Sequence, residues 1–137
     1  MKNIGSVKED HAIEKRISIT PETVKKFIDL NFSILLEKKY GEHLGITDDE
    51  YKNVGATLYD SVKEVLEKSQ IILKVNCPSN DEINSIQDKS ILIGQFDPIS
   101  DKKRLNKLIK KNINIFSLNL LPRITRAQSM DVLSSQA

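Results

Sequence analysis

The sequence lacks the residues that would point to several specialised classes of protein. Its 137 residues include no tryptophan, only three tyrosines and four phenylalanines, and one cysteine. The core must therefore be built from aliphatic side chains. A single cysteine, Cys77, excludes an internal disulfide and suits a reducing compartment. Because Cys77 precedes Pro78 at an expected strand end, we predict a small buried side chain and not a reactive thiol.

Long apolar runs and clustered charges of one sign are also missing. No segment approaches the roughly 20 apolar residues of a membrane span, and Ile4–Val7 is too short for the apolar part of a signal peptide. The net charge is +2, with both signs interspersed, whereas nucleic-acid binding requires clustered Lys and Arg with aromatic residues for stacking. The sequence predicts a soluble chain with no nucleic-acid partner, no direct membrane insertion and no metal site. The charged run Lys102–Lys111 is interpreted as the solvated face of a helix.

Apolar runs alternate with amphipathic stretches along the chain, which is the pattern of an α/β domain with a parallel sheet. Strands are expected at Lys2–Val7, Phe32–Glu37, Ala56–Tyr59, Ile71–Val75, Ser90–Phe96 and Ile113–Leu120. Helices are expected at Glu22–Leu30, from Thr47 to near Gly55, and at Ser61–Glu67, Ser79–Ile86 and Asp101–Lys111. We therefore expect one domain over residues 1–137, with a Rossmann-like or flavodoxin-like parallel sheet flanked by helices.

Two of these helices have clear local signals. Thr20 followed by Pro21 is typical of a helix start, and Thr47 precedes an acidic first turn. Helical spacing then predicts which side chains face the core. These are Val24, Phe27 and Ile28 in the first helix, and Leu105, Leu108 and Ile109 in the last.

The segment Leu121–Ala137, LPRITRAQSMDVLSSQA, sets polar side chains at helical spacing directly after the last expected strand. Thr125 can cap a helix that begins at Arg126, and Gln128 stands where the reciprocal partner of a capping box belongs. At 100° per residue, one face of this helix carries polar groups within about 60° of one another, and the other side points towards a core. The polar face holds Gln128, Asp131 and Ser135 with Ser134 on its flank, and the apolar side holds Met130, Leu133 and Ala137.

The string PRITRAQSMDVLSSQA resembles the nicotinamide-site loop and helix of the NAD(H)-binding component (domain I, alpha subunit) of proton-translocating NAD(P) transhydrogenases. In that family the stretch reads approximately P-R-x-[ST]-R-A-Q-x-[ML]-D-x-L-S-S-[QM]-[AS]. Val7–Pro21 and Leu73–Pro78 resemble the same superfamily, which includes alanine dehydrogenase. The resemblance implies hydride transfer between NADH and NADP+, coupled to proton translocation. NAD(H) would bind here and NADP(H) on a partner component.

The resemblance also implies an assembly. The expected partners are the membrane-embedded and NADP(H)-binding components, and the full-length subunit would be a homodimer. The expected location is cytoplasmic, peripheral on the inner face of a bacterial plasma membrane.

The family motif assigns roles to individual positions. Arg123, Asp131 and Ser134 match residues that contact the nicotinamide of NAD(H) and its phosphates or ribose. A carboxylate and a hydroxyl one helical turn apart can fix the rotation of a carboxamide, which decides the ring face that offers the hydride. Gln128 matches the glutamine that reaches towards the second nicotinamide, and the alternative is a capping-box role alone. Arg126 is either a phosphate contact or a surface charge at the helix start.

Arg16 and Lys74 match residues that hold the keto-acid substrate in alanine dehydrogenases, so they are candidate remnants of an ancestral substrate site. The alternative is a structural role in ion pairs that line the cleft. Dehydrogenases of this superfamily place a proton-donating histidine at a strand end where this chain has Gly94–Phe96. The histidines present, His11 and His43, fall in expected surface loops. Because hydride exchange between nicotinamides needs no proton donor, the missing histidine favours transhydrogenation over amino-acid oxidation.

The glycines Gly5, Gly41, Gly45, Gly55 and Gly94 cannot form the G-x-G-x-x-G turn that holds a pyrophosphate. The chain also stops at Ala137, inside the family motif. We therefore expect an N-terminal fragment or one piece of a split gene, with half a site, no NAD-binding Rossmann domain and weak NAD(H) binding on its own. Two alternatives stay open. One is a fragment of an alanine-dehydrogenase-like amino-acid dehydrogenase, and the other is a truncated, non-catalytic domain.

Overall fold

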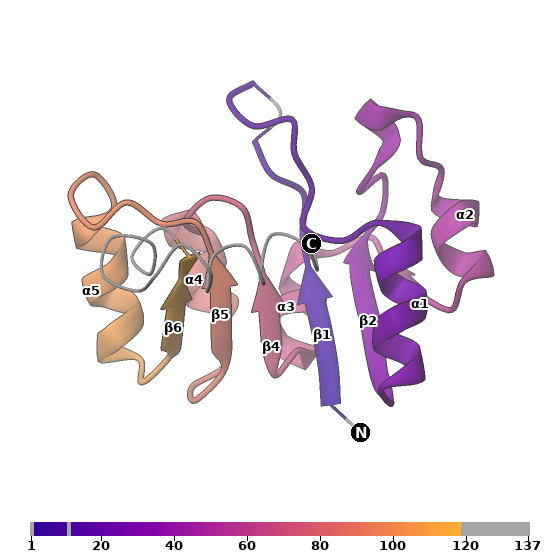
Figure 1. Ribbon diagram of the computed structural model, residues 1–137. Helices are drawn as coiled ribbons and strands as arrows, with labels where there is room; N and C mark the ends of the chain where they lie inside the picture. The colour runs from indigo at the N-terminus through magenta and orange to yellow at the C-terminus, as the bar shows by residue number, and fades with distance from the viewer. Residues whose placement is uncertain (1, 11, 119–137) are drawn as a thin grey trace, which may run out of the picture.

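A computed structural model describes residues 2–10 and 12–118, in which six parallel strands form one sheet (Figure 1). The strands are β1 (Lys2–Ser6), β2 (Phe32–Glu37), β3 (Thr57–Tyr59), β4 (Ile71–Leu73), β5 (Ile91–Gly94) and β6 (Asn114–Ser117). Their order across the sheet is β3-β2-β1-β4-β5-β6, so the direction of winding reverses between β1 and β4. This is the Rossmann-type doubly wound order, and it confirms the expected parallel α/β fold.

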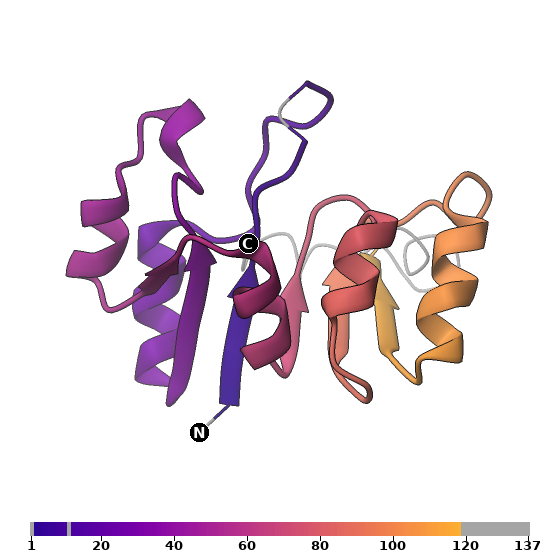
Figure 2. The same cartoon turned by 180° about the vertical axis from the view of Figure 1, so that it is seen from behind.

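Helices cover the two faces of the sheet unequally. They are α1 (Pro21–Asp29), the short 3-10 helix η1 (Glu42–Leu44), α2 (Asp48–Asn53), α3 (Val62–Lys68), α4 (Asn80–Ser85) and α5 (Lys102–Lys110). Figure 2 shows α3, α4 and α5 side by side on one face, while α1 lies on the other face over the β1–β2 side of the sheet. Two cores follow: one under α3–α5, and one between α1, α2 and strands β1–β3. They are mainly but not purely aliphatic, because the few aromatic residues include the fully buried Tyr40, Tyr51 and Phe96.

Local capping explains why several helices begin where the sequence predicts. Thr20 accepts a hydrogen bond from the Thr23 amide at 3.2 Å, with Pro21 in the first position of α1. Complete capping boxes start α2, from Thr47 and Glu50, and α4, from Ser79 and Glu82. None of the described helices is long and apolar enough to cross a bilayer.

Two sequence expectations need correction. Ile109 was expected to face the core, but its side chain is 60% exposed, whereas Leu108 is fully buried. Helix α5 lies at the sheet edge and packs mainly on β6 and α4. Only a narrow stripe of α5 is therefore covered, and Ile109 falls outside it. Strands β4 and β5 are also shorter than expected and end at Leu73 and Gly94. Beyond Leu73, backbone amides donate hydrogen bonds to a carboxylate side chain that belongs to the candidate site.

Lys111 joins α5 to α4 by binding the exposed carbonyl end of α4. Its Nζ donates to the carbonyl oxygens of Ile86 at 2.6 Å, Ile83 at 2.9 Å and Asn84 at 3.3 Å. The last carbonyls of a helix have no intrahelical donor and carry the negative end of the helix dipole. One ammonium at the end of α5 therefore donates hydrogen bonds to the free carbonyl groups at the end of α4.

Substituting Lys111→Met should lower the free energy of unfolding by about 1–2 kcal/mol, because charge-assisted bonds to the α4 carbonyls are lost. Urea unfolding followed by circular dichroism measures the change. The neighbouring Lys110, which is exposed on α5, gives a matched control, and Lys110→Met should leave stability nearly unchanged. Equal effects of the two substitutions would contradict the capping role.

Candidate functional site

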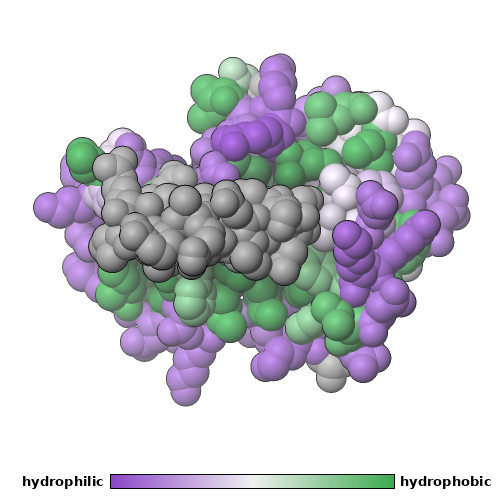
Figure 3. Space-filling model, in the orientation of Figure 1, coloured by the Kyte–Doolittle hydropathy of each residue, from purple (hydrophilic) through white to green (hydrophobic). Residues whose placement is uncertain are grey.

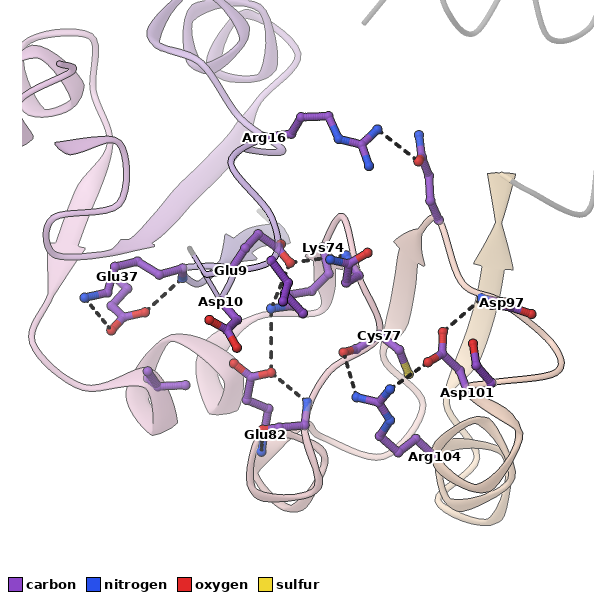
Figure 4. Close-up of a pocket in the computed structure, with 17 residues that line it drawn as sticks. Glu9, Asp10, Arg16, Glu37, Lys74, Cys77, Glu82, Asp97, Asp101 and Arg104 are labelled. Carbon is purple, nitrogen blue, oxygen red and sulfur yellow. Dashed lines mark hydrogen bonds and ion pairs between the residues drawn. The ribbon is translucent and has the colours of Figure 1, made fainter. Parts of the chain in front are cut away.

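A cavity of about 770 Å³ opens at the carboxyl ends of the strands, where β1 and β4 diverge (Figure 4). Ligands of doubly wound sheets bind in this crevice, at the point where the winding reverses, and cavities of roughly 300–1,000 Å³ accommodate small ligands. Its walls are formed by the segments that follow β1, β4 and β5 and by residues at or near the starts of α3, α4 and α5. The cavity is therefore the candidate functional site.

Lys74 is a buried cation in the wall of this cavity. It follows β4 directly, and its side chain is 5% exposed. The ammonium lies 3.4 Å from Glu9 Oε1 and 3.6 Å from Glu82 Oε1. A buried charge is tolerated only when it is paired and hydrogen-bonded, and here two carboxylates share one ammonium.

Glu9 also holds the end of β4. It stands after β1 with a side chain that is 2% exposed, and it accepts hydrogen bonds from the amides of Val75 at 2.9 Å and Asn76 at 3.2 Å. Backbone hydrogen bonds to the β5 side continue through Lys74 and Val75, whereas the Val75 amide donates to the Glu9 carboxylate in place of a β1 carbonyl. Glu9 thus joins the two strands at the point where they separate.

Arg16 forms a second ion pair, at the mouth of the cavity. Its Nε donates to Glu14 Oε2 at 2.8 Å and its Nη2 to Glu14 Oε1 at 2.9 Å, while Nη1 donates to Gln95 Oε1 at 3.2 Å. The hydrogen bonds from the Arg16 side chain lower the pKa of Glu14 to about 2, in opposition to the effect of burial. The guanidinium of Arg16 therefore makes hydrogen bonds on two edges, a bidentate pair to Glu14 and a single bond to Gln95.

The wall as a whole is acidic. Its charged side chains are the cations Lys8, Arg16, Lys74 and Arg104 and the carboxylates Glu9, Asp10, Glu37, Glu82, Asp97 and Asp101. Two of the cationic side chains form ion pairs outside the Lys74 cluster. Lys8 lies 3.7 Å from Glu37, and Arg104 lies 2.6 Å from Asp101. With six carboxylates against four cations, the wall disfavours phosphates and favours a neutral or positively charged group.

Cys77 lies in the same wall as a small buried side chain, as predicted, with 7% of its surface exposed. Burial raises the pKa of its thiol to about 11. The thiol is therefore protonated at neutral pH and is not a nucleophile.

A smaller cavity of about 320 Å³ adjoins the first and shares Arg16, Lys74 and Gln95 with it. Apolar side chains make up most of the remaining wall: Ile17, Leu73, Val75, Ile93 and Leu118. Gly94 lets β4 and β5 approach here, because a Cβ at this position would overlap the Lys74 carbonyl oxygen and the Phe96 ring. The carboxyl edge thus carries a charged cavity beside an apolar one.

Residues 5–137 match the family model described as "Alanine dehydrogenase/PNT, N-terminal domain". The chain belongs to this family. It is 34% identical, over 139 aligned residues, to a polypeptide of NAD(P) transhydrogenase subunit alpha from Rhodospirillum rubrum; the alignment covers 98% of this chain and 36% of that protein. Alanine dehydrogenase of Methanococcus maripaludis is 31% identical over 110 residues, 80% of this chain and 30% of the relative.

A solved structure of transhydrogenase from Sinorhizobium meliloti superimposes on this alanine dehydrogenase/PNT domain with a TM-score of 0.86 and 34% identity. The superposition covers 98% of this chain and 40% of that one. The chain therefore spans about a third of the length of the relatives that it matches.

The structure brings together two of the residues singled out in the sequence. Arg16 and Lys74 line the same cavity, each engaged by carboxylates of this chain, and their functional role stays a prediction. Gln95 stands at the end of β5 and accepts from Arg16. The other candidates, Gln128 with Arg123, Asp131 and Ser134, lie outside the described residues.

Neither histidine is among the described residues that line the cavity. His11 lies outside the described residues, and His43 lies in η1, where its Nε2 is 2.8 Å from the carbonyl oxygen of Lys15.

Sequence reasoning missed the three carboxylates that pair with Lys74 and Arg16. Glu9 and Glu14 stand in the stretch that carries the family resemblance, but their pairing with Lys74 and Arg16 was not predicted. Glu82 stands three residues after Ser79, at the spacing of a capping box. The usable signal for Glu9 was its place just after a buried strand, because the carboxyl ends of parallel strands meet at one edge of the sheet.

Replacement Lys74→Met should lower the free energy of unfolding by about 3–5 kcal/mol, because it leaves Glu9 and Glu82 as unpaired charges in a buried site. Urea unfolding near neutral pH measures the loss. Lys8→Met removes a partly exposed pair with Glu37 and should change stability by less than about 1 kcal/mol. Similar small losses in both variants would show that the Lys74 cluster is not required for stability.

The Glu14 carboxylate should make the protein sensitive to acid. Its pKa is depressed in the folded state from 4.5 to about 2, so its stabilising contribution is present above the unfolded value and is lost as the pH falls between them. Glu14→Gln should therefore destabilise the protein near neutral pH and have progressively less effect below pH 4.5. Urea midpoints measured across this range check the prediction, and a stability difference that is constant with pH would contradict it.

Proposed function

We propose that this chain belongs to the NAD(H)-binding component of a proton-translocating NAD(P) transhydrogenase. In that enzyme it would carry the wall that meets the nicotinamide ring. The assembled enzyme would include membrane-embedded and NADP(H)-binding partners and a dimeric NAD(H)-binding subunit, attached to the cytoplasmic face of a bacterial membrane. The relatives named as NAD(P) transhydrogenase subunit alpha support this proposal, since they align with 98% of the chain.

The observation that carries the proposal is the composition of the cavity wall. Arg16 and Lys74 are both engaged by carboxylates of this chain, so an anionic keto acid would have to displace those carboxylates before either cation could bind it. The acidic wall suits the ring end of the coenzyme, because the oxidised nicotinamide is positively charged and the phosphates are negative. The phosphates would then be bound by another module.

The absence of a histidine from the described portion of the cavity wall fits the same reaction. When both nucleotides are bound, a hydride leaves C4 of the dihydronicotinamide of NADH with its electron pair and joins C4 of the nicotinamide of NADP+, which yields NAD+ and NADPH. No proton is exchanged at the reacting carbons. This chain would bind and orient the ring, and Gln128 would position it against the second ring.

One observation favours a second function. Arg16 and Lys74 line one cavity, as an amino-acid dehydrogenase of the alanine dehydrogenase type would require. In that reaction Glu14 would release Arg16 when a substrate carboxylate binds. Pyruvate and ammonia would condense to an imine with loss of water, and NADH would then transfer a hydride to the imine carbon while a proton from solvent joins the nitrogen, which yields alanine and NAD+.

The test is Gln128→Asn in the assembled enzyme. Shortening the side chain by one methylene should slow hydride transfer from NADH to NADP+ by about 10- to 100-fold, because misplacement by about 1 Å is sufficient for such losses. Single-turnover absorbance measures the transfer rate, and NADH titration should show an affinity within about threefold of the wild type.

Gln136→Asn makes the same chemical change in the same segment and should leave the rate unaltered. An unchanged rate in Gln128→Asn would remove this residue from the mechanism. Ammonia-dependent reduction of pyruvate, abolished by Arg16→Met, would instead establish the amino-acid dehydrogenase.

A further inference from the structure

Helix α5 and the residue that follows it carry a strong positive charge. Residues 102–111 hold six of the 21 Lys and Arg residues of the chain and none of its 19 Asp and Glu residues. The rest of the chain has 15 cations against 19 carboxylates, so the overall charge of +2 comes entirely from this segment. Figure 3 shows hydrophilic residues over the outer side of α5, at the left edge of the view.

Solvation alone does not account for this arrangement of charges. Opposite charges four residues apart stabilise a helix, whereas like charges at that spacing destabilise it. Helix α3 has two lysine–glutamate pairs at this spacing, one of which joins Lys63 to Glu67. In α5, Lys103 stands four residues before Lys107, and the helix contains no carboxylate to offset the repulsion. A bound anion would remove this repulsion.

Four of these cations line a cavity of about 580 Å³ at the start of α5, beside the start of α4. Its described wall contains no carboxylate and consists of Asn80, Ile99, Ser100, Lys102, Lys103, Arg104 and Lys107. It adjoins the acidic cavity, with which it shares Ser100 and Arg104. Two neighbouring cavities thus have opposite charge, and this one favours an anion.

Two of the four cations are held in place by hydrogen bonds. Lys107 Nζ donates to Asn80 Oδ1 at 3.1 Å, which leaves the amide NH2 group of Asn80 as a donor. Arg104 donates to Asp101 Oδ1 at 2.6 Å and to the carbonyl oxygen of Cys77 at 3.3 Å. These bonds position two positive charges at the wall before any ligand binds.

The other two cations, Lys102 and Lys103, are exposed, and neither forms an ion pair with a carboxylate in the part of the chain that the structure describes. We propose that this cavity binds a phosphate group, with Lys107 and Arg104 behind it and the ammonium groups of Lys102 and Lys103 closing over it. A phosphate monoester carries a charge of about −1.5 to −2 at neutral pH, and lysine binds phosphate as a point charge.

A phosphate of this kind occurs both in soluble molecules and in lipid headgroups. Ile99, at the edge of the cavity, is 85% exposed. An exposed apolar side chain beside lysines is also found where proteins bind to the surface of an anionic bilayer. The experiment therefore has one arm for each source of phosphate.

The first arm is nuclear magnetic resonance of the 137-residue chain, titrated with inorganic phosphate at constant ionic strength. The amides of residue 80 and residues 100–104 should shift and reach saturation with a dissociation constant on the order of 1 mM or lower. The combined substitution Lys102→Gln and Lys103→Gln should weaken binding by about tenfold, because each exposed ion pair contributes a few-fold.

Lys25→Gln with Lys26→Gln is the matched control, because it makes the same chemical change at two exposed lysines of α1. This variant should alter the dissociation constant by less than about twofold. Shifts that sodium chloride reproduces, or equal losses of affinity in the two double variants, would indicate general screening of charge and overturn the proposal.

The second arm is sedimentation with vesicles of phosphatidic acid and phosphatidylcholine, compared with vesicles of phosphatidylcholine alone. Retention by phosphatidic acid that is lost in the Lys102 and Lys103 double variant assigns the phosphate to a lipid headgroup. Ile99→Ser should then weaken retention severalfold, whereas Ile13→Ser, at a side chain that is 75% exposed in another loop, should not.

Saturable shifts with inorganic phosphate, without retention by the vesicles, assign the phosphate to a soluble molecule. A chain that responds in neither arm overturns the proposal. Circular dichroism of each variant reports whether the domain stays folded. Neither arm contains a nicotinamide nucleotide, so the outcome is independent of the proposed function.

Discussion

The structure at the carboxyl edge of the sheet depends on the ion pairs of the buried Lys74 ammonium. Where β1 and β4 diverge, backbone amides lose their strand partners, and Glu9 accepts two of them from Val75 and Asn76. A carboxylate that is 2% exposed needs a cation beside it, and Lys74 provides one at 3.4 Å. The same ammonium reaches Glu82 at the start of α4. Three segments are thus held by one buried charge.

The loop that carries Arg16 is held by a second buried group. Tyr40, which follows β2, donates to Ser6 Oγ at 2.8 Å and accepts from the Ser18 amide at 3.0 Å. Ser6 in turn donates to the Leu73 carbonyl oxygen at 2.7 Å, so β1, β4 and the Arg16 loop share one chain of hydrogen bonds. Burial raises the pKa of Tyr40 to about 12, which keeps its hydroxyl able to donate. The backbone of the Arg16 loop is therefore connected to β1 and β4 by hydrogen bonds.

The elements that the sequence predicted correctly are those specified within a few residues. Thr20 with Pro21 and Thr47 with Glu50 determine where α1 and α2 begin, and alternating apolar runs indicate a parallel sheet. The ends of β4 and β5 could not be predicted in the same way, because β4 ends at a contact with Glu9, 66 residues away from Val75. Ile109 was misplaced for a similar reason, since helical spacing does not reveal that α5 lies at the sheet edge.

The candidate site likewise contains residues that the sequence indicated and contacts that it could not predict. The family resemblance indicated Arg16 and Lys74, and the structure places both in one cavity. It could not indicate that Glu14 and Glu9 would engage them, since those pairings depend on how loops meet after folding. These ion pairs change the chemical interpretation of the cavity. Two cations alone would suggest a site for an anion, but together with their carboxylate partners they form part of an acidic wall. An acidic wall favours a positively charged group over a phosphate, so the proposed binding of a dinucleotide would require a second module to hold its pyrophosphate.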